Sequence, residues 1–150
     1  MDEPLPRRHD HIGRDVLAIH ADFQARARAQ LGRRGHRLTP SLIALLPHLD
    51  ERGTTVTVAA RHAGISKQAV GKLVTELERL GYVERRAHPD DMRATLVAFT
   101  EPGRRLLGDI VATIDGIEAS YAEAIGTSRF HELRALLGEL RAAAVTNSDR

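Results

Sequence analysis

The sequence contains no cysteine and no tryptophan, and only five of its 150 residues are phenylalanine or tyrosine. The lack of cysteine excludes disulfide scaffolds, cysteine-ligated zinc, iron–sulfur clusters and thiol redox sensing. Proteins that bind single-stranded nucleic acid stack bases on aromatic side chains, so the scarcity of aromatic residues argues against that class. What remains is an ordinary globular composition, with 42% hydrophobic and 28% charged residues, at a length that suits one compact domain or two small lobes.

Long apolar runs are also lacking. No stretch approaches the roughly 20 residues that a bilayer-spanning helix needs. The N-terminal residues 1–6 are acidic and lack the apolar segment of a secretory signal peptide. We therefore expect a cytoplasmic protein with no membrane partner.

Neither sign of charge dominates the whole chain, because 22 Lys and Arg residues stand against 20 Asp and Glu residues. The balance varies along the chain. Residues 61–105 carry nine basic and six acidic side chains, a difference of +3, whereas residues 106–150 carry four and seven, a difference of −3. A basic middle segment followed by an acidic one suggests that the first meets a polyanion and the second does not. A chance scatter of solvated charges is the alternative explanation.

Apolar periodicity predicts a mainly helical chain with one small antiparallel β ribbon. Turn and capping residues separate the elements: Thr39-Pro40 starts a helix that Pro47 bends or shortens, Ser66 caps a long helix, and Gly81 ends it. The predicted helices cover residues 10–35, 40–52, 57–64, 67–80, 100–121 and 130–140, and the predicted strands cover residues 82–86 and 95–99. Residues 54–57 form either a short strand or an extended lead-in.

Residues 58–70 have the spacing of a helix-turn-helix. Two helices that cross steeply need small residues at their contact. Three alanines occupy the expected positions: Ala59, Ala60 and Ala63. Gly64 supplies the residue of positive φ that the turn needs. Apolar side chains must hold the second helix in place, and we expect Ile65, Val70 and Leu73 to do so. An ordinary helical hairpin with a glycine turn is the alternative.

The exposed start of the second helix and the ribbon carry the candidate DNA contacts. Short polar and cationic side chains suit base edges and phosphates in a major groove; those of the helix-turn-helix are Arg61, Ser66, Lys67, Gln68, Lys72 and Thr75. The ribbon adds Arg85, Arg86, His88, Asp91 and Arg93. We expect Arg93 to reach the neighbouring minor groove, with Asp91 holding its guanidinium. Solvated surface lysines and a local ion pair of little energetic worth are the alternative interpretation.

These residues resemble the MarR family of bacterial transcriptional regulators over residues 38–107. The motifs that carry the resemblance are Leu38-Thr39-Pro40, Leu80-Gly81-Tyr82, Asp91-Met92-Arg93 and Thr100-Glu101-Pro102-Gly103. The resemblance implies a mainly α fold, a winged helix-turn-helix with a small antiparallel β wing, flanked by N- and C-terminal dimerisation helices. It also implies a homodimeric repressor on a pseudo-palindromic operator of double-stranded DNA. A small aromatic or phenolic effector releases the DNA from many members of this family.

On this basis we expect five segments along the chain. They are a flexible arm (1–9), an N-terminal dimerisation helix (10–35), a DNA-binding winged helix-turn-helix (38–104), C-terminal dimerisation helices (105–145) and a tail (146–150). No cofactor is expected. The lining of an effector pocket is not assigned by the sequence.

There are three alternatives to a DNA-binding regulator that responds to a small effector. A metal-responsive regulator of the same fold is the first, but none of the eight histidines forms the His-x-x-x-His spacing that grips zinc from one helix face. An enzyme is the second, and the sequence lacks a glycine-rich phosphate loop, a Gly-x-Ser-x-Gly elbow and paired carboxylates, so no catalysis is expected. A winged helix that binds protein instead of DNA is the third.

Overall fold

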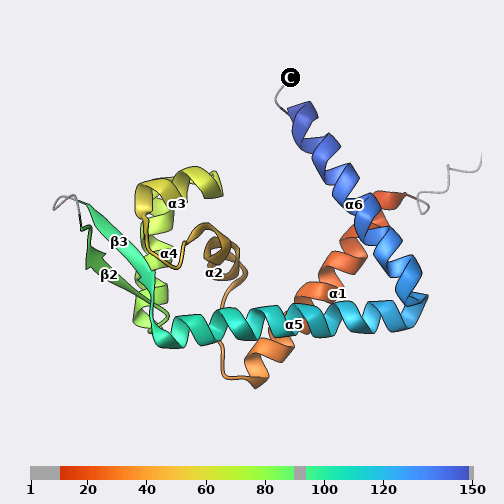
Figure 1. The fold of residues 1–150 in the computed structure, drawn as a ribbon, viewed down its shortest axis with the longest axis horizontal. Coiled ribbons are helices and arrows are strands. Elements are labelled where there is room, and N and C mark those ends of the chain that lie inside the picture. The colour runs from red at the N-terminus through yellow and green to blue at the C-terminus, as the bar shows by residue number, and fades with distance from the viewer. Residues whose placement is uncertain (1–10, 90–93, 149–150) are drawn as a thin grey trace, which may run out of the picture. The chain divides into compact units, whose positions relative to one another are not determined.

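A computed structural model describes residues 11–89 and 94–148, and it confirms a mainly helical fold with a small antiparallel sheet (Figure 1). The elements, in chain order, are α1 (Ile12–Arg33), α2 (Pro40–Leu45), the 3-10 turn η1 (Leu46–His48), β1 (Thr54–Thr55), α3 (Val56–Ala63), α4 (Lys67–Arg79), β2 (Val83–Ala87), β3 (Thr95–Phe99), α5 (Glu101–Ile125) and α6 (Thr127–Ser148). The last helix thus continues into the segment 146–150, which we expected to be a tail.

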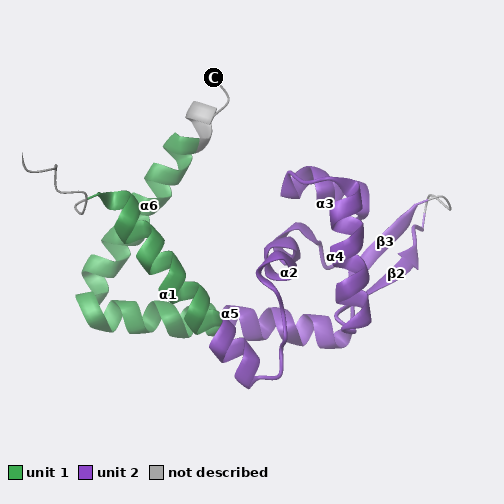
Figure 2. Cartoon of the chain, turned by 180° about the vertical axis from the view of Figure 1, so that it is seen from behind, with its two compact units in different colours: residues 1–27, 112–150 green, residues 28–111 purple. Residues whose placement is uncertain are grey.

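The chain divides into two compact units (Figure 2). Residues 28–111 form one, called here the winged-helix unit. Residues 1–27 together with 112–150 form the other, called here the terminal-helix unit. Helices α1 and α5 each contribute to both units, so the boundaries fall within helices and not in loops.

The start of the winged-helix unit follows the predicted capping chemistry. The Thr39 side chain accepts a hydrogen bond from the Leu42 backbone N–H at 3.3 Å, and Pro40 occupies the first helical position. Helix α2 then ends at Leu45, and Pro47 lies in the 3-10 turn that follows. Because proline lacks the backbone N–H that a continuing α-helix needs, the predicted shortening at this residue is confirmed.

The sheet has three strands in the order β1-β3-β2, all antiparallel. Residues 54–57 therefore begin as a strand, which resolves the choice that the sequence left open. Thr54 pairs with Val97, and Val97 also pairs with Arg85 on its other side. The two-residue strand β1 directly precedes α3 and pairs with β3, the central strand of the sheet, so it joins the start of α3 to the sheet.

A single apolar core lies inside the winged-helix unit. Its thirteen buried residues come from α2 to α5 and from the sheet: Leu42, Leu45, Leu46, Leu49, Ala59, Ala60, Val70, Val74, Leu77, Val83, Val97, Phe99 and Leu106. Val70, Val74 and Leu77 recur at spacings of four and three on α4, so one face of this helix is fully buried. The opposite face of α4 is left for solvent or for a partner.

The terminal-helix unit is organised around a polar junction between α1 and α5. Asp22 accepts a hydrogen bond from the Tyr121 hydroxyl at 2.7 Å and pairs with Arg26 at 2.8 Å. Arg26 also donates to Ser120 at 3.0 Å and lies 5.4 Å from the centre of the Tyr121 ring. The Tyr121 hydrogen bond, followed by Arg26, lowers the pKa of Asp22, while burial and Asp22 raise the pKa of Tyr121.

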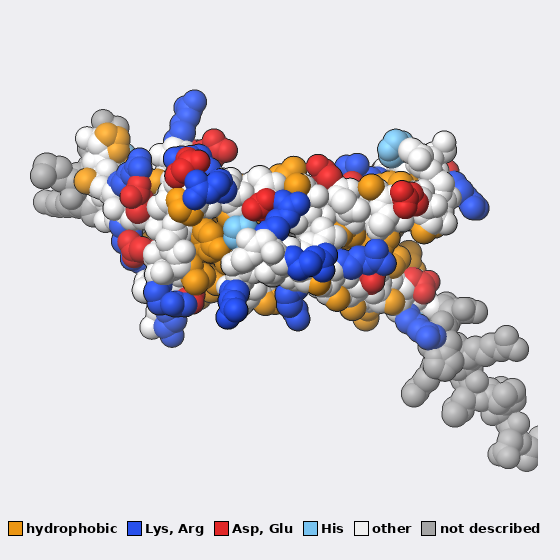
Figure 3. Space-filling model, turned by 90° about the horizontal axis from the view of Figure 1, so that it is seen from below, with side chains coloured by type: hydrophobic (Ala, Val, Ile, Leu, Met, Phe, Trp, Pro, Cys, Tyr) orange, Lys and Arg blue, Asp and Glu red, His pale blue; other side chains and the backbone are white. Residues whose placement is uncertain are grey.

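Much of the apolar surface of the terminal-helix unit is exposed. A groove of about 410 Å³ lies between α1, α5 and α6, with Phe23, Phe130 and Leu137 in its lining. Ile12 and Leu140 remain 69% and 55% exposed, and Figure 3 shows apolar side chains at the surface next to the start of α1. Over the described residues, no helix is long and apolar enough to cross a membrane.

Candidate nucleic-acid interface

The turn between α3 and α4 has the geometry that the sequence predicts. Gly64 adopts the left-handed conformation, with φ 67° and ψ 25°, directly after the last residue of α3. The backbone N–H groups of Gly64 and Ile65 both donate to the Ala60 carbonyl, which closes the helix end. Ser66 then caps α4 by accepting from the Ala69 N–H at 3.1 Å. Three residues therefore separate two helices, as in a helix-turn-helix, and α3 crosses near the start of α4 (Figure 1).

The residues that hold α4 in place are only partly those expected. Val70 is fully buried and Leu73 packs against the core, as predicted. Ile65 is 43% exposed, so its predicted role as an apolar plug is wrong. Its side chain lines an open pocket of about 490 Å³ together with Leu45 and Leu73. The reason is the position of the buried face of α4. This face begins at Val70 and continues through Val74 and Leu77, so it does not include Ile65, which lies in the turn before the helix.

The first half of α4 presents its candidate contacts to solvent. Lys67, Gln68 and Lys72 are exposed, and so is Arg61 at the end of α3. Among the described side chains, no carboxylate pairs with Lys67, Lys72 or Arg61. The charges of these three side chains are therefore not neutralised by an ion pair among the described residues. Ser66 uses its oxygen for the helix cap, and its hydroxyl hydrogen has no partner among the described residues.

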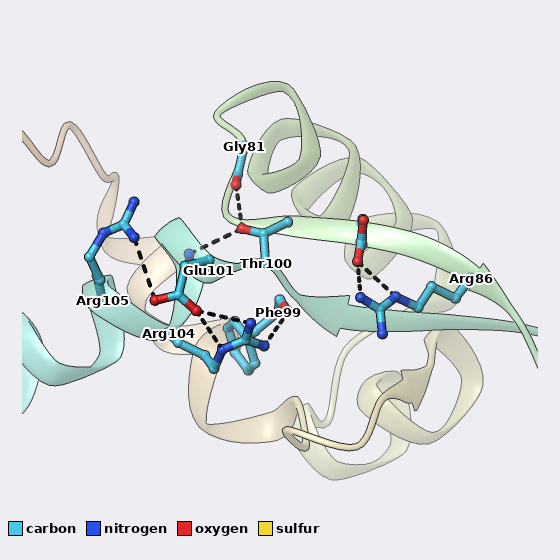
Figure 4. A network of polar contacts seen from close by, with 9 residues as sticks. Gly81, Arg86, Phe99, Thr100, Glu101, Arg104 and Arg105 are labelled. Atoms are coloured by element: carbon cyan, nitrogen blue, oxygen red, sulfur yellow. Dashed lines mark hydrogen bonds and ion pairs between the residues drawn. The ribbon is translucent and has the colours of Figure 1, made fainter.

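The second half of α4 and strand β2 carry charges that neutralise one another. Arg85 pairs with Glu78 and also donates to the Thr75 hydroxyl at 3.2 Å. Arg86 lies beside Glu84 on the same strand and donates to it through Nε at 2.7 Å (Figure 4). Figure 3 likewise shows acidic and basic side chains intermixed on the face it presents. Three expected contact residues, Thr75, Arg85 and Arg86, thus already have partners within the unit.

The wing tip is described only in part. Asp91 and Arg93, the expected minor-groove pair, and Met92 between them lie outside the described residues. The His88 backbone N–H donates to the Ala94 carbonyl at 3.1 Å, which closes the ribbon below the tip. The His88 side chain is half-buried and lines a cavity of about 520 Å³ with His48 and His62. In the described part of the chain, no three His, Cys, Asp or Glu side chains are grouped so that they could hold a metal ion.

The base of the wing is fixed by residues whose role the sequence did not reveal. The Thr100 hydroxyl donates to the Gly81 carbonyl at 2.5 Å and accepts from the Gly103 N–H at 3.1 Å, so it joins the end of α4 to the start of α5 (Figure 4). At Gly103 a Cβ atom would collide with the Tyr82 carbonyl oxygen. The spacing Thr100–Gly103 was visible in the sequence as part of a motif, but only the close backbone approach explains it.

A second polar junction was not anticipated. His36, in the segment between α1 and α2, contacts the Tyr82 hydroxyl through Nδ1 at 2.8 Å and Asp109 through Nε2 at 2.9 Å. Arg34 pairs with the same carboxylate. The hydrogen bond from His36, followed by that from Arg34, lowers the pKa of Asp109, and burial raises the pKa of Tyr82. The hydrogen-bonded partners are 46 to 75 positions apart in the chain, so no local pattern could have indicated that they meet.

Comparisons with known proteins agree with this geometry. A model of the MarR family matches residues 36–94. The uncharacterised protein Rv2011c of Mycobacterium tuberculosis (strain H37Rv) is 29% identical over 128 residues, covering 83% of this chain and 88% of that protein.

Two solved structures share the fold over most of the chain. CouR from Rhodococcus jostii RHA1, bound to p-coumaroyl-CoA, is 28% identical with a TM-score of 0.65, and the match covers 87% of this chain and 92% of CouR. The crystal structure of MarR gives a TM-score of 0.69 at 20% identity, covering 91% of this chain and 99% of MarR. Residues 36–94 of this chain therefore match the MarR family, and the chain shares the fold of CouR and MarR over most of its length.

Proposed function

We propose that this protein is a homodimeric regulator that binds double-stranded DNA in a sequence-specific manner and represses transcription until a small effector releases it. The observation that carries the proposal is a helix-turn-helix whose second helix exposes Lys67 and Lys72 without any described acidic partner. Cations without acidic partners on an exposed helix can bind the phosphates of double-stranded DNA, whose major groove is wide enough for an α-helix. Duplex DNA is also the expected partner of a winged helix that resembles the MarR family.

In this proposal α4 enters a major groove. Its N-terminal half and the capping residue before it supply the base-edge and phosphate contacts, through Ser66, Lys67, Gln68 and Lys72, with Arg61 of α3 near the DNA backbone. The wing supplies the contacts that flank them, through Arg86, His88, Asp91 and Arg93. Segment 38–104 is the DNA-binding domain, and the helices within residues 10–35 and 105–145 form the dimer.

The exposed apolar surface of the terminal-helix unit supports the dimer. Side chains such as Ile12, Val16 and Leu137 line its groove while they are 46% to 69% exposed. A surface this apolar is more typical of an interface than of a monomer's exterior. A two-fold symmetric dimer would place its two recognition helices in successive major grooves, so the operator half-sites should lie about ten base pairs apart, or a multiple of that.

The effector in this proposal is a small aromatic or phenolic compound. Its support is the likeness to CouR, which was crystallised with p-coumaroyl-CoA. Titration of aromatic acids and their thioesters into the protein–DNA complex tests this part separately. Release of DNA by one of them at micromolar concentration supports it, and an undisturbed complex with all of them counts against it.

Salt-dependent DNA binding tests the central claim. The full-length protein is used to select a duplex from a random-sequence pool, and affinity is then measured by fluorescence anisotropy across a range of salt concentrations. Log affinity should fall steeply with log salt, because phosphate contacts release counterions. Lys72→Gln should lower the slope by about one unit. Failure to select any duplex, together with a flat salt response, would favour a winged helix that binds protein. Calorimetric titration with zinc distinguishes the metal-responsive alternative by its heat signal.

A further inference from the structure

We propose that Arg85 is a positioning residue for DNA binding: it ties the second half of the recognition helix α4 to the wing strand β2 and does not itself contact phosphate. This inference rests on the proposed function above. From the sequence we expected Arg85, like its neighbour Arg86, to contact DNA directly. In this inference Arg85 has a different role.

The contacts of Arg85 point back toward α4. Its guanidinium uses Nη1 for the Glu78 carboxylate and Nη2 for the Thr75 hydroxyl at 3.2 Å. Arg85 stands in the middle of β2, whereas Glu78 and Thr75 lie one turn apart on α4. The planar fork of arginine can hold two acceptors at fixed directions, which a single ammonium group cannot do. The pair is also only 36% and 37% exposed, so solvent covers a minority of each side chain.

Thr75 is prepared for this contact. Its hydroxyl hydrogen is donated to the Gly71 carbonyl at 2.9 Å, so the oxygen presents its lone pairs outward. Arg85 occupies one of them. The hydroxyl hydrogen of Thr75 is thus not available to a base or phosphate in this arrangement, and its oxygen serves the link between helix and wing.

The other arginine pairs of this region do not connect elements. Arg79 binds Glu76 within a single turn of α4, at 2.6 Å and 2.9 Å. Arg86 binds Glu84 within β2. Among the described ion pairs of α4 and the wing, the Arg85–Glu78 pair alone spans two elements. Breaking it would remove an ion pair that links the helix to the wing, in addition to the hydrogen bonds at the wing base, whereas breaking the others would remove no such link.

Orientation matters here because the helix and the wing must reach different grooves at the same time. Strands β2 and β3 are paired through all five residues of each, so the ribbon moves as one piece. Its attachment to α4 therefore sets where the wing tip lies when α4 is seated in a major groove. A link that fixes this angle before binding lowers the conformational cost of the complex without adding a contact.

Removal of Glu78 gives opposite results for the two roles. If Arg85 contacted phosphate, Glu78→Gln would release its charge and remove a repelling carboxylate, so affinity for DNA would rise. For a positioning residue, Glu78→Gln should weaken binding to the selected duplex about tenfold, a typical value for one lost specific interaction. Arg85→Gln should have the same effect, and the double variant should be no worse than either, because both changes break one link.

The salt slope and the specificity ratio complete the test. Both variants should leave the slope of log affinity against log salt unchanged, while Lys72→Gln lowers it by about one. The loss should be confined to the selected duplex and absent for random-sequence DNA, at an unchanged free energy of unfolding in urea. The matched control is Arg79→Gln, which breaks a pair within α4 and should leave the preference for the selected duplex intact.

Two results would overturn the inference: tighter binding by Glu78→Gln, or a slope reduced by about one in Arg85→Gln. Weaker binding by Arg85→Gln that is additive with Glu78→Gln would overturn it as well. Absence of DNA binding by the unmodified protein would instead remove the proposed function, so the two failures are distinguishable. If Arg85→Gln proves unstable in urea, Glu78→Gln alone decides between the roles.

Discussion

The winged-helix unit buries its apolar residues within itself, while the terminal-helix unit leaves many of them exposed. In the first, residues from α2 to α5 close one core, and fully buried side chains such as Val74 and Leu77 recur along α4. In the second, Ile117 and Phe130 are buried, yet Leu17 is 70% exposed on the same unit. One unit thus buries its apolar side chains in a core of its own, whereas the other presents many of them at its surface.

The units differ in their polar groups as well. In the winged-helix unit, the Thr100 hydroxyl makes two hydrogen bonds at the wing base. In the terminal-helix unit, the Thr113 hydroxyl is buried and has no partner among the described residues. An unsatisfied buried hydroxyl costs free energy that a satisfied one does not. The comparison therefore predicts that removing the threonine hydroxyl will change the free energy of unfolding in opposite directions in the two units.

The largest effect is expected at Gly103, where α5 leaves the wing. Gly103→Ala places a methyl group against the Tyr82 carbonyl, and a backbone atom cannot yield as a side chain can. We expect a loss of about 3 kcal/mol in the free energy of unfolding, measured in urea, at the upper end of overpacking costs. Gly108→Ala on the same helix is the control, because nothing lies within 4 Å of its added Cβ. That control should gain up to about 1 kcal/mol from helix propensity. Similar results for both variants would show that the close approach at Gly103 is unimportant.

The next largest effect concerns the terminal-helix unit and its assembly. Leu137→Lys places a charge in the apolar groove between α1, α5 and α6. If a second copy covers this groove, the dimer dissociation constant should rise about a hundredfold, since a buried anchor is lost. Sedimentation velocity measures this directly. Ala135→Lys adds the same charge two residues away on α6, outside the groove lining, and should leave the dimer intact. Equal sedimentation of both variants would contradict the assignment of this groove to the dimer.

Local signals in the sequence predicted most of the winged-helix unit. Thr39, Ser66 and Gly64 act where capping and turn chemistry placed them, because these effects depend on neighbours within four residues. Pro47 ended α2 for the same reason. The sequence could not decide between a strand and an extended segment at β1, because two residues are too few to show the alternation of side chains that marks a strand. The prediction for Ile65 was wrong because residue type alone does not show whether an apolar side chain of the turn is covered by the core.

The remaining features depend on contacts between residues far apart in the chain. His36 meets Tyr82 and Asp109 across 46 and 73 positions, and nothing in the composition of these segments marks them as neighbours. The partners of Arg85 and Arg86 were missed for a different reason. Side-chain direction decides whether a basic residue faces DNA or a carboxylate of its own unit, and residue type alone does not.

A smaller effect on stability is expected from two threonines, of which one has a hydrogen-bonded hydroxyl and the other, in the part of the chain that the structure describes, does not. Thr113→Val removes a buried hydroxyl that has no partner among the described residues, so the free energy of unfolding should rise by about 1 kcal/mol. Thr100→Val removes a hydroxyl with two hydrogen bonds and should lower it by about 2 kcal/mol. Chemical denaturation of both variants at one protein concentration measures the difference. A fall in stability for Thr113→Val would show that its hydroxyl is satisfied in the assembled protein.

The smallest expected effect is a dependence of stability on pH. Each unit contributes to it through one aspartate whose pKa is lowered. In the winged-helix unit the pKa of Asp109 is lowered from 3.8 by hydrogen bonds from His36 and Arg34. Because the folded state holds the proton less tightly than the unfolded state, the stabilisation is fully present above 3.8 and is lost as the pH falls through the lowered, folded-state value.

Asp109→Asn should therefore flatten the fall in stability below about pH 4, measured by urea unfolding monitored at several pH values. Asp22→Asn provides the matched change in the terminal-helix unit, where Tyr121 and Arg26 lower the pKa of the carboxylate. Each substitution should flatten the curve partially, and the double substitution should flatten it by the sum, since the two carboxylates share no described hydrogen-bond partner. If the fall in the free energy of unfolding below about pH 4 is unchanged in Asp109→Asn but reduced in Asp22→Asn, the acid-sensitive contact lies in the terminal-helix unit alone.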